Sequence, residues 1–242
     1  MEKELDTNEE IIPSLREEQV RLTQTRILDT FESELIRHGY AEISMRAVAK
    51  RAGMSVPTVY RYYPNKQALL RALMESLTAD QGDGWLKILA SNTDPMETIT
   101  KLLDYHWDAN EQQPGRTKAV LNAMAAASNG EGGEAAEEAM KRFAFMAREA
   151  VAPLSYLGPQ ETRKLEATVA VLLSRPTWQR LRLGHEVPRD VARSAVLDAA
   201  RGSIDAAQTR AGGRGGAKPQ GQLPDRSEAA LKQRYKGASK KL

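Results

Sequence analysis

Four hydrogen-bonding side chains occupy one short stretch of the chain, at Thr58, Tyr60, Arg61 and Tyr62. Their hydroxyls and guanidinium can donate to phosphate oxygens, and a guanidinium also matches the acceptor groups on base edges. Val59 interrupts the row. On a helix it would turn toward the preceding helix and leave the other four side chains more exposed. The stretch predicts a nucleic-acid contact surface, because the alternative, packing within an ordinary helical hairpin, does not explain an exposed row of this composition.

The elements that must position this row are two short helices joined by a glycine turn. Ser44 is a suitable N-cap for the first helix and Ser55 for the second. Gly53 can adopt the left-handed conformation that ends the first helix at little cost. Pro57 fits the first turn of the second helix, where its missing N–H is not needed. The segment is therefore expected to form a helix-turn-helix.

Two further helices are expected around this pair. Residues 18–38 carry apolar side chains at three- and four-residue spacing, and Asn65 can cap a helix built on a leucine-rich stripe. Lys66, at the start of that helix, would combine a cation with free N–H donors that suit a phosphate. Three helices around a small core can present the second helix of the pair to the major groove of DNA.

The distribution of charge supports the same interpretation. Between residues 19 and 79 there are nine Lys and Arg residues against five Asp and Glu, whereas the whole 242-residue chain carries a net charge of only +3. Residues 1–18 have a net charge of −5, residues 80–205 of −3 and residues 206–242 of +7. Positive charge is thus concentrated on the expected DNA-binding helices and on the C-terminal tail.

The pattern from Arg21 to Leu77 resembles the tetracycline-repressor (TetR) family of transcriptional regulators. The resemblance implies an all-α fold, in which an N-terminal three-helix helix-turn-helix domain is followed by a larger helical bundle. It also implies that the bundle binds a small molecule and forms a two-fold homodimer. The segments that carry it are Ile27–Leu28, Gly39–Tyr40, Met45–Ala49, Ala52–Ser55, Pro57–Tyr63 and Asn65–Leu70.

Carried over position by position, the resemblance also implies a set of DNA contacts. Tyr60 and Lys66 are expected to hold phosphates. Arg46, Arg61 and the helix tip at residues 56–58 are better placed to touch base edges. The serine and the threonine of the set can serve either purpose. The complete set is Ser44, Arg46, Val56, Pro57, Thr58, Tyr60, Arg61, Tyr62 and Lys66.

Four regions follow from these patterns. Residues 1–18 form an acidic N-terminal extension, which is either disordered or part of the first helix, and residues 19–66 form the DNA-binding domain. By the resemblance, residues 67–208 are the helical ligand-binding and dimerisation domain, with 67–79 as the linking helix. Residues 209–242 are a basic tail expected to be disordered, because glycine, proline and positive charge occur without apolar periodicity. Within this tail the sequence is compatible with a weak helix at 226–236, which would carry Leu231 and Tyr235 on one side.

The larger domain offers candidates for dimerisation and for ligand binding. By the resemblance, the last two helices, at about 160–174 and 188–207, form the dimer interface; the alternative is that they are plain core helices. An apolar, adaptable cavity would suit a largely apolar effector, although a methionine or aromatic residue at helical spacing more often belongs to the core. No buried cluster of charge is expected. The candidate ligand residues are Leu103, Trp107, Met124, Phe143 and Met146.

Other classes of function lack support in the sequence. There are no cysteines, three scattered histidines, no phosphate-binding loop and no spaced catalytic unit, so no enzyme activity, metal or cofactor is expected. No signal peptide or membrane span is expected either, which predicts a cytoplasmic protein. The sequence predicts a repressor that binds a double-stranded, pseudo-palindromic DNA operator as a homodimer and is released by an unidentified small molecule. An activator of the same fold and a non-specific or architectural DNA binder remain open.

Overall fold

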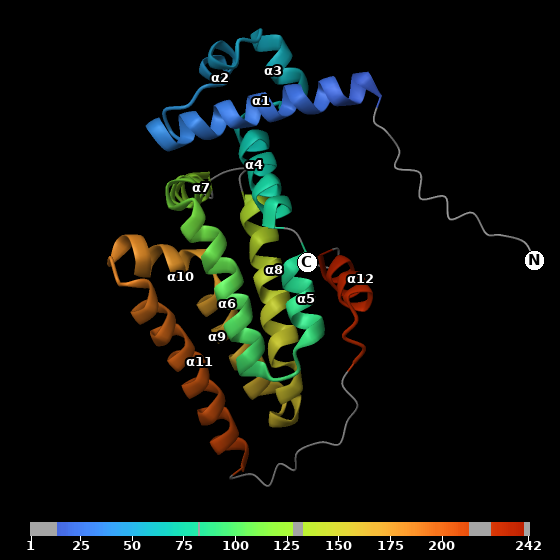
Figure 1. The fold of residues 1–242 in the computed structure, drawn as a ribbon, viewed down its shortest axis with the longest axis vertical. Helices are drawn as coiled ribbons and strands as arrows, with labels where there is room; N and C mark the ends of the chain where they lie inside the picture. The colour runs from blue at the N-terminus through green and yellow to red at the C-terminus, as the bar shows by residue number, and fades with distance from the viewer. Residues whose placement is uncertain (1–13, 82, 128–132, 213–223, 240–242) are drawn as a thin grey trace, which may run out of the picture.

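The computed structural model describes residues 14–81, 83–127, 133–212 and 224–239, and within these ranges it is all-α, without strands. No helix in the described part of the chain is long and apolar enough to cross a membrane. The elements, labelled as in Figure 1, are α1 (Leu15–His38), α2 (Met45–Ala52), α3 (Val56–Tyr62), α4 (Lys66–Gln81), α5 (Gly84–Ser91), α6 (Pro95–Gln112), α7 (Pro114–Ala127), α8 (Gly133–Val151), the 3₁₀ segment η1 (Ala152–Leu157), α9 (Pro159–Leu173), α10 (Arg175–Gln179), the π-helical turn η2 (Arg180–Gly184), α11 (Arg189–Gly212) and α12 (Glu228–Ser239).

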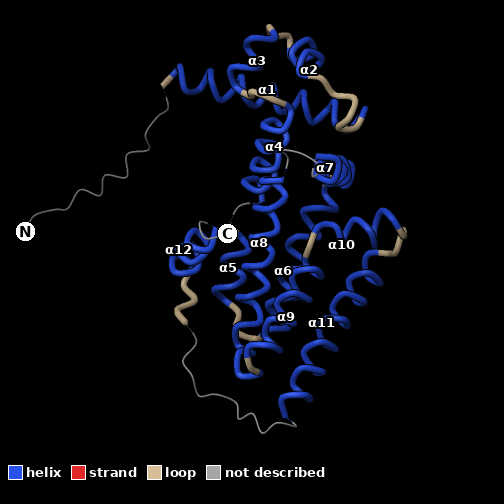
Figure 2. The backbone as a smooth tube through the Cα atoms, turned by 180° about the vertical axis from the view of Figure 1, so that it is seen from behind, coloured by secondary structure: helices blue, strands red, loops and turns tan. Residues whose placement is uncertain are grey.

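The helices form two parts stacked end to end. Helices α1, α2 and α3 lie together at one end, and α4 leads from them toward the rest of the molecule (Figure 1). Helices α5, α6, α8 and α9 make up the body of the bundle, with α10 and α11 on one flank and α12 on the other. The reverse view shows the same arrangement (Figure 2). The expected all-α architecture, a helix-turn-helix followed by a larger bundle, is confirmed.

Helix α1 begins earlier than its apolar pattern suggests. The Ser14 side chain accepts a hydrogen bond from the backbone N–H of Glu17, and the Glu17 carboxylate accepts one from the backbone N–H of Ser14 at 2.8 Å. This reciprocal pair is a capping box, which satisfies donors that the first turn would otherwise leave free. Residues 15–18 of the expected acidic extension therefore belong to α1, and residues 1–13 lie outside the described part.

The N-terminal core is shared between the DNA-binding helices and a helix from later in the chain. Ile27 and Phe31 of α1 are fully buried in it, together with apolar residues of α2, α3 and α4. Val120 and Ala123 of α7 complete the same core. Helix α7 therefore packs against α1 and α4, although 40 or more residues separate it from the helix-turn-helix in sequence.

The C-terminal tail does not have the structure expected from its composition. Residues 209–212 continue α11, and α12 packs against α5 and α8. Leu231 of α12 is fully buried in the bundle core, and the Tyr235 ring makes edge contacts with Trp85 and Phe145. The helix allowed for at 226–236 is present as α12. The expectation of a disordered tail is wrong for these segments, because their apolar side chains pack on the bundle. Residues 213–223 and 240–242 lie outside the described part.

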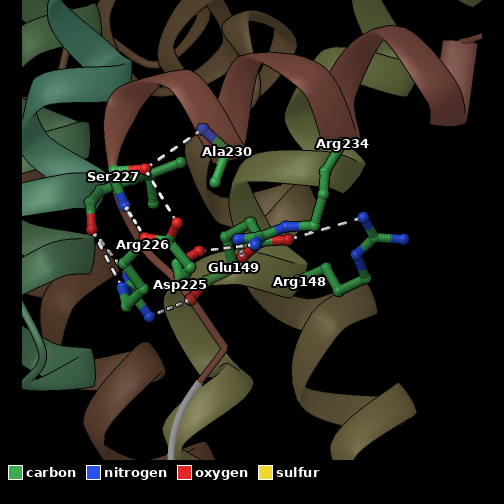
Figure 3. A network of polar contacts seen from close by, with 8 residues as sticks. Arg148, Glu149, Asp225, Arg226, Ser227, Ala230 and Arg234 are labelled. Carbon is green, nitrogen blue, oxygen red and sulfur yellow. Dashed lines mark hydrogen bonds and ion pairs between the residues drawn. The ribbon is translucent and has the colours of Figure 1, made fainter.

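Polar contacts fix the start of α12 on the bundle (Figure 3). The Arg226 guanidinium donates to the backbone oxygens of Leu89 and Glu149, which lie in the last turns of α5 and α8. Carbonyls in a last helical turn have no partner within the helix, so one arginine satisfies acceptors on two helices at once. Arg234 adds an ion pair with the buried Glu149 carboxylate, at 2.9 Å.

Candidate nucleic-acid interface

The two helices of the motif begin and end as their sequence predicts. The Ser44 hydroxyl accepts from the backbone N–H of Ala47 at 3.1 Å, and that of Ser55 accepts from the backbone N–H of Thr58 at 3.2 Å. Gly53 has φ of 69° and ψ of 33°, the left-handed conformation that ends α2. The two capping hydrogen bonds and the Gly53 conformation set the direction of α3 relative to α2.

Replacing Gly53 by alanine is expected to lower the free energy of unfolding by roughly 1–2 kcal/mol, because a side chain disfavours the left-handed conformation. An added Cβ would also lie 3.3 Å from the Arg26 guanidinium. Chemical denaturation of the full chain measures the change. Gly237→Ala is the matched control: it lies within α12 with open space around it, so the substitution should be neutral or slightly stabilising. Equal effects at both positions would contradict the conformational argument.

Helix α3 is held by one buried residue and presents a polar outer face. Val59 is fully buried against the N-terminal core, as its place in the row predicts. On the outer face Tyr60 is 48% exposed, and Arg61 and Pro57 are exposed as well. Arg46, on α2, is also exposed. These side chains form a surface that a DNA duplex can reach.

Other members of the predicted contact set are partly engaged within the protein. Val56 and Tyr62 are half-buried against the N-terminal core, and the Thr58 hydroxyl lies 2.7 Å from that of Ser55. The Arg61 guanidinium lies 5.1 Å from the centroid of the Tyr62 ring. This cation–π contact restricts the arginine before any DNA is bound, and a restricted side chain loses less conformational entropy on binding.

Lys66 has a partner that the sequence did not reveal. Its ammonium donates to the Tyr40 backbone oxygen at 2.7 Å and lies 4.2 Å from the centroid of the Tyr40 ring. Burial lowers the pKa of Lys66, and the nearby Glu42 carboxylate partly offsets this. An ammonium has three N–H donors, so two remain for a phosphate at the start of α4. Asn65 caps this helix as expected, accepting from the Ala68 N–H at 2.7 Å.

An ion pair holds α2 against α1. The Arg51 guanidinium lies 2.8 Å from a Glu34 carboxylate oxygen, and Glu34 is buried within α1. A partly buried pair is screened by salt less than an exposed one. The position of the helix-turn-helix on α1 therefore rests on this pair as well as on apolar packing.

Residues 27–73, which contain this capped motif, match the family model described as bacterial regulatory proteins, tetR family. The chain belongs to the TetR family. The EthR transcriptional regulator of Mycolicibacterium smegmatis is 30% identical over 110 residues, which cover 45% of this chain and 48% of the relative. The KstR repressor of the same species is 45% identical over 56 residues, covering 23% of this chain and 28% of the relative. The chain thus spans less than half the length of these curated relatives.

The fold is shared with TetR structures over a larger part of the chain. A TetR transcriptional regulator from Rhodococcus sp. RHA1 aligns with 76% of this chain and 97% of its own, with a TM-score of 0.52 and 22% identity. At this identity the likeness concerns the fold alone. The comparisons therefore place both the helix-turn-helix and the helical bundle within the TetR architecture.

The predicted ligand residues of this TetR-family chain do not gather in one place. Leu103, Trp107, Phe143 and Met146 are buried in the bundle core, whereas Met124 is half-buried against the N-terminal core. His106, on the same helix as Leu103 and Trp107, is buried too, with its Nε2 3.3 Å from the Met146 sulfur. Burial lowers the pKa of His106 well below its usual value, and Arg142 and Arg175 lower it further, so the ring is neutral.

A cavity of about 320 Å³ lies elsewhere in this TetR-family bundle, between α4, α6, α7 and α10. None of the five predicted ligand residues lines it. Its lining is mixed: Met74, Tyr105, Asp108, Ala109, Asn110, Gln112, Gln113, Arg116, Thr117, Val120, Leu121 and Arg175. The volume is at the small end of the range for ligand pockets, about 300–1,000 Å³.

The expectation of no buried charged cluster is wrong. Arg142 and Arg175 are both buried, close enough for each to influence the same histidine. One signal could have pointed to this region: Asn110 follows His106 and Leu103 at helical spacing on α6, which places it on the same face of the helix. Arg175 gave no such signal, because it begins a five-residue helix that is too short for a periodic pattern.

Proposed function

We propose that this TetR-family chain is a ligand-responsive transcriptional repressor that binds a pseudo-palindromic operator as a homodimer and leaves it when a small molecule binds the bundle. The observation that carries the proposal is the geometry of α3. The helix is capped at its start and anchored by Val59, and it presents Tyr60 and Arg61 beside Arg46. A helix of this kind can enter the major groove while neighbouring groups hold phosphates. The relative named a repressor supports the direction of regulation.

The proposed dimer uses α9 and α11. These helices pack against each other, and Val171 and Val191 are 63% and 53% exposed on them. Glu161 of α9 pairs with Arg210 of α11 at 2.7 Å and also with Lys164. Hydrogen bonds from both cations lower the pKa of Glu161 to about 2, so its carboxylate stays ionised at neutral pH. A joined helix pair that exposes these two valines suits pairing with a second copy.

The proposal is tested by footprinting the purified protein on genomic fragments, together with light scattering to measure its mass in solution. A protected inverted repeat, with half-sites about one helical turn (~34–36 Å) apart, and a dimeric mass are expected. A folded protein that protects no inverted repeat would refute the proposal. Equal affinity for the repeat and for random DNA at every salt concentration would instead favour a non-specific binder. Increased transcription from a promoter that carries the repeat would identify an activator.

Tyr60→Phe is expected to weaken binding to specific and random DNA by a similar factor, because it removes a hydroxyl assigned to a phosphate. Arg61→Ala is the contrasting variant: it should cost roughly 1–3 kcal/mol and relax the preference at one base position. Fluorescence anisotropy with a set of single-base operator variants measures both effects. A loss confined to one base position in Tyr60→Phe would reassign that residue to base recognition. An unchanged preference in Arg61→Ala would reassign the arginine to the backbone.

A further inference from the structure

Two buried polar groups line the 320 Å³ cavity, and neither has a partner among the side chains that the structure describes. Arg175 is 7% exposed and Asn110 is 2% exposed. None of the side chains that the structure describes forms a hydrogen bond or ion pair with the Arg175 guanidinium, and the buried Asn110 amide nitrogen has no hydrogen-bond partner among them. Leaving such groups unpaired is costly for a buried amide and more so for a charge. Their placement therefore points to a partner that enters the cavity.

The charges around the cavity specify the partner's sign. Burial lowers the pKa of Arg175 to about 10 and the nearby Arg142 contributes, but the guanidinium remains charged at neutral pH. The carboxylate in the lining, Asp108, is paired with Arg189 of α11. The Glu111 carboxylate, also on α6, accepts hydrogen bonds from Arg182 and from the Trp178 indole. The cavity thus presents a cation whose neighbouring carboxylates are already paired.

We propose that this cavity binds a small organic carboxylate, with the acid group paired to Arg175 and accepting a hydrogen bond from Asn110. A guanidinium can hold a carboxylate through two parallel hydrogen bonds. The body of the ligand would rest on Met74, Val120 and Leu121, the apolar part of the lining. The inference rests on the proposed function, because it names the class of effector. It replaces the expectation of a largely apolar effector with an amphipathic anion.

The position of the cavity explains how such a ligand would reach the DNA-binding helices. Met74 of α4 and Val120 of α7 belong both to the cavity lining and to the N-terminal core. Arg116, another lining residue on α7, pairs with Glu32 of α1 at 2.7 Å. A ligand that favours a different placement of α4 or α7 would shift α1, and with it the spacing of the recognition helices in a dimer.

The test uses the full chain and a series of straight-chain carboxylates from acetate to decanoate, with benzoate, each paired with its primary amide. Thermal unfolding and calorimetry measure binding. At least one carboxylate should raise the melting temperature. Its amide should bind the unaltered chain about tenfold or more weakly, and the carboxylate itself should bind Arg175→Met about tenfold or more weakly. Asn110→Leu should weaken it as well. Arg180→Met is the matched control, since Arg180 is exposed and does not line the cavity. Hexyl phosphate tests whether the cavity prefers a phosphate to a carboxylate.

Four results of the binding measurements would overturn the proposal. They are equal stabilisation of Arg175→Met and the unaltered chain, amides that bind as well as acids, a series in which no carboxylate binds, and a preference for hexyl phosphate. A purely structural role for Arg175 makes a different prediction. Without added carboxylate, Arg175→Met should unfold at the same temperature or higher, because an unpaired buried charge has been removed. A melting temperature several degrees lower would show that the guanidinium stabilises the fold and would also overturn the proposal.

DNA binding separates this inference from the proposed function. Arg175→Met should still protect the operator, but the carboxylate that releases the unaltered protein should no longer release the variant. Release that persists in the variant would overturn the inference and leave the regulator intact. Carboxylate binding without any protected inverted repeat would overturn the proposed regulator and leave the ligand site standing.

Discussion

Ending the chain after Gly212 is expected to destabilise the protein strongly. The truncation removes α12, which uncovers the Trp85 and Phe145 rings and leaves the buried Glu149 without Arg234. Leu231→Ala alone should cost about 2–5 kcal/mol, because a fully buried leucine leaves a cavity. In a chain of this size each kcal/mol lowers the melting temperature by roughly 2–4 °C. Differential scanning calorimetry measures both variants.

Gln233→Ala is the control for this prediction, because the glutamine is exposed on the same helix. It should change the stability by no more than about 0.5 kcal/mol. If the truncated chain melted at the temperature of the full chain, α12 would not be packed on the bundle in solution. If the truncation destabilised the protein and Leu231→Ala did not, the polar contacts of Arg226 would be the main attachment.

Val59→Asp is expected to abolish specific DNA binding. The substitution places a carboxylate at the fully buried position that anchors α3, where burying a charge is costly. A seven-residue helix is not stable by itself, so α3 should lose its structure when this anchor fails. Loss of operator binding in anisotropy should accompany a cost of several kcal/mol in the N-terminal core. Most of the helical circular dichroism should persist, because the bundle core does not include α3.

Val20→Asp is the matched substitution for Val59→Asp. Val20 is 37% exposed on α1, so the same change in chemistry should leave stability within about 0.5 kcal/mol. Operator binding by Val59→Asp that matched the unaltered protein would show that α3 does not contact the DNA. If Val20→Asp lost as much stability as Val59→Asp, the burial of Val59 would not be the cause of the loss.

The sequence was most informative where structure is set by nearby residues. Ser44, Gly53 and Ser55 act within a turn of their own positions, so the bounds of α2 and α3 followed from residue type. The last bundle helices were also placed to within a few residues, apart from the C-terminal extension of α11. Helix α12 was only weakly indicated. Its stability depends on Leu231 and Arg226 meeting a surface made by α5 and α8, which local composition does not describe.

The candidate site was predicted unevenly for the same reason. The exposed face of α3 followed from the spacing around Val59. The contact between Lys66 and the Tyr40 carbonyl joins residues 26 positions apart, so only the folded chain reveals it. The cavity required four helices to be placed in space before Asn110 and Arg175 could be seen to share it. Side-chain chemistry alone had favoured aromatic and methionine residues that belong to the cores.

Helix α7 has a consequence for how this protein can be dissected. Because its Val120 and Ala123 complete the packing of α1 to α4, the helix-turn-helix does not form a portable module that ends with α4. A fragment cut there would carry an uncovered apolar face and a Glu32 side chain deprived of Arg116. The helix-turn-helix half can therefore be transplanted into a chimera only together with α7, which also lines the cavity, so an exchange of helical bundles has to place its junction beyond α7.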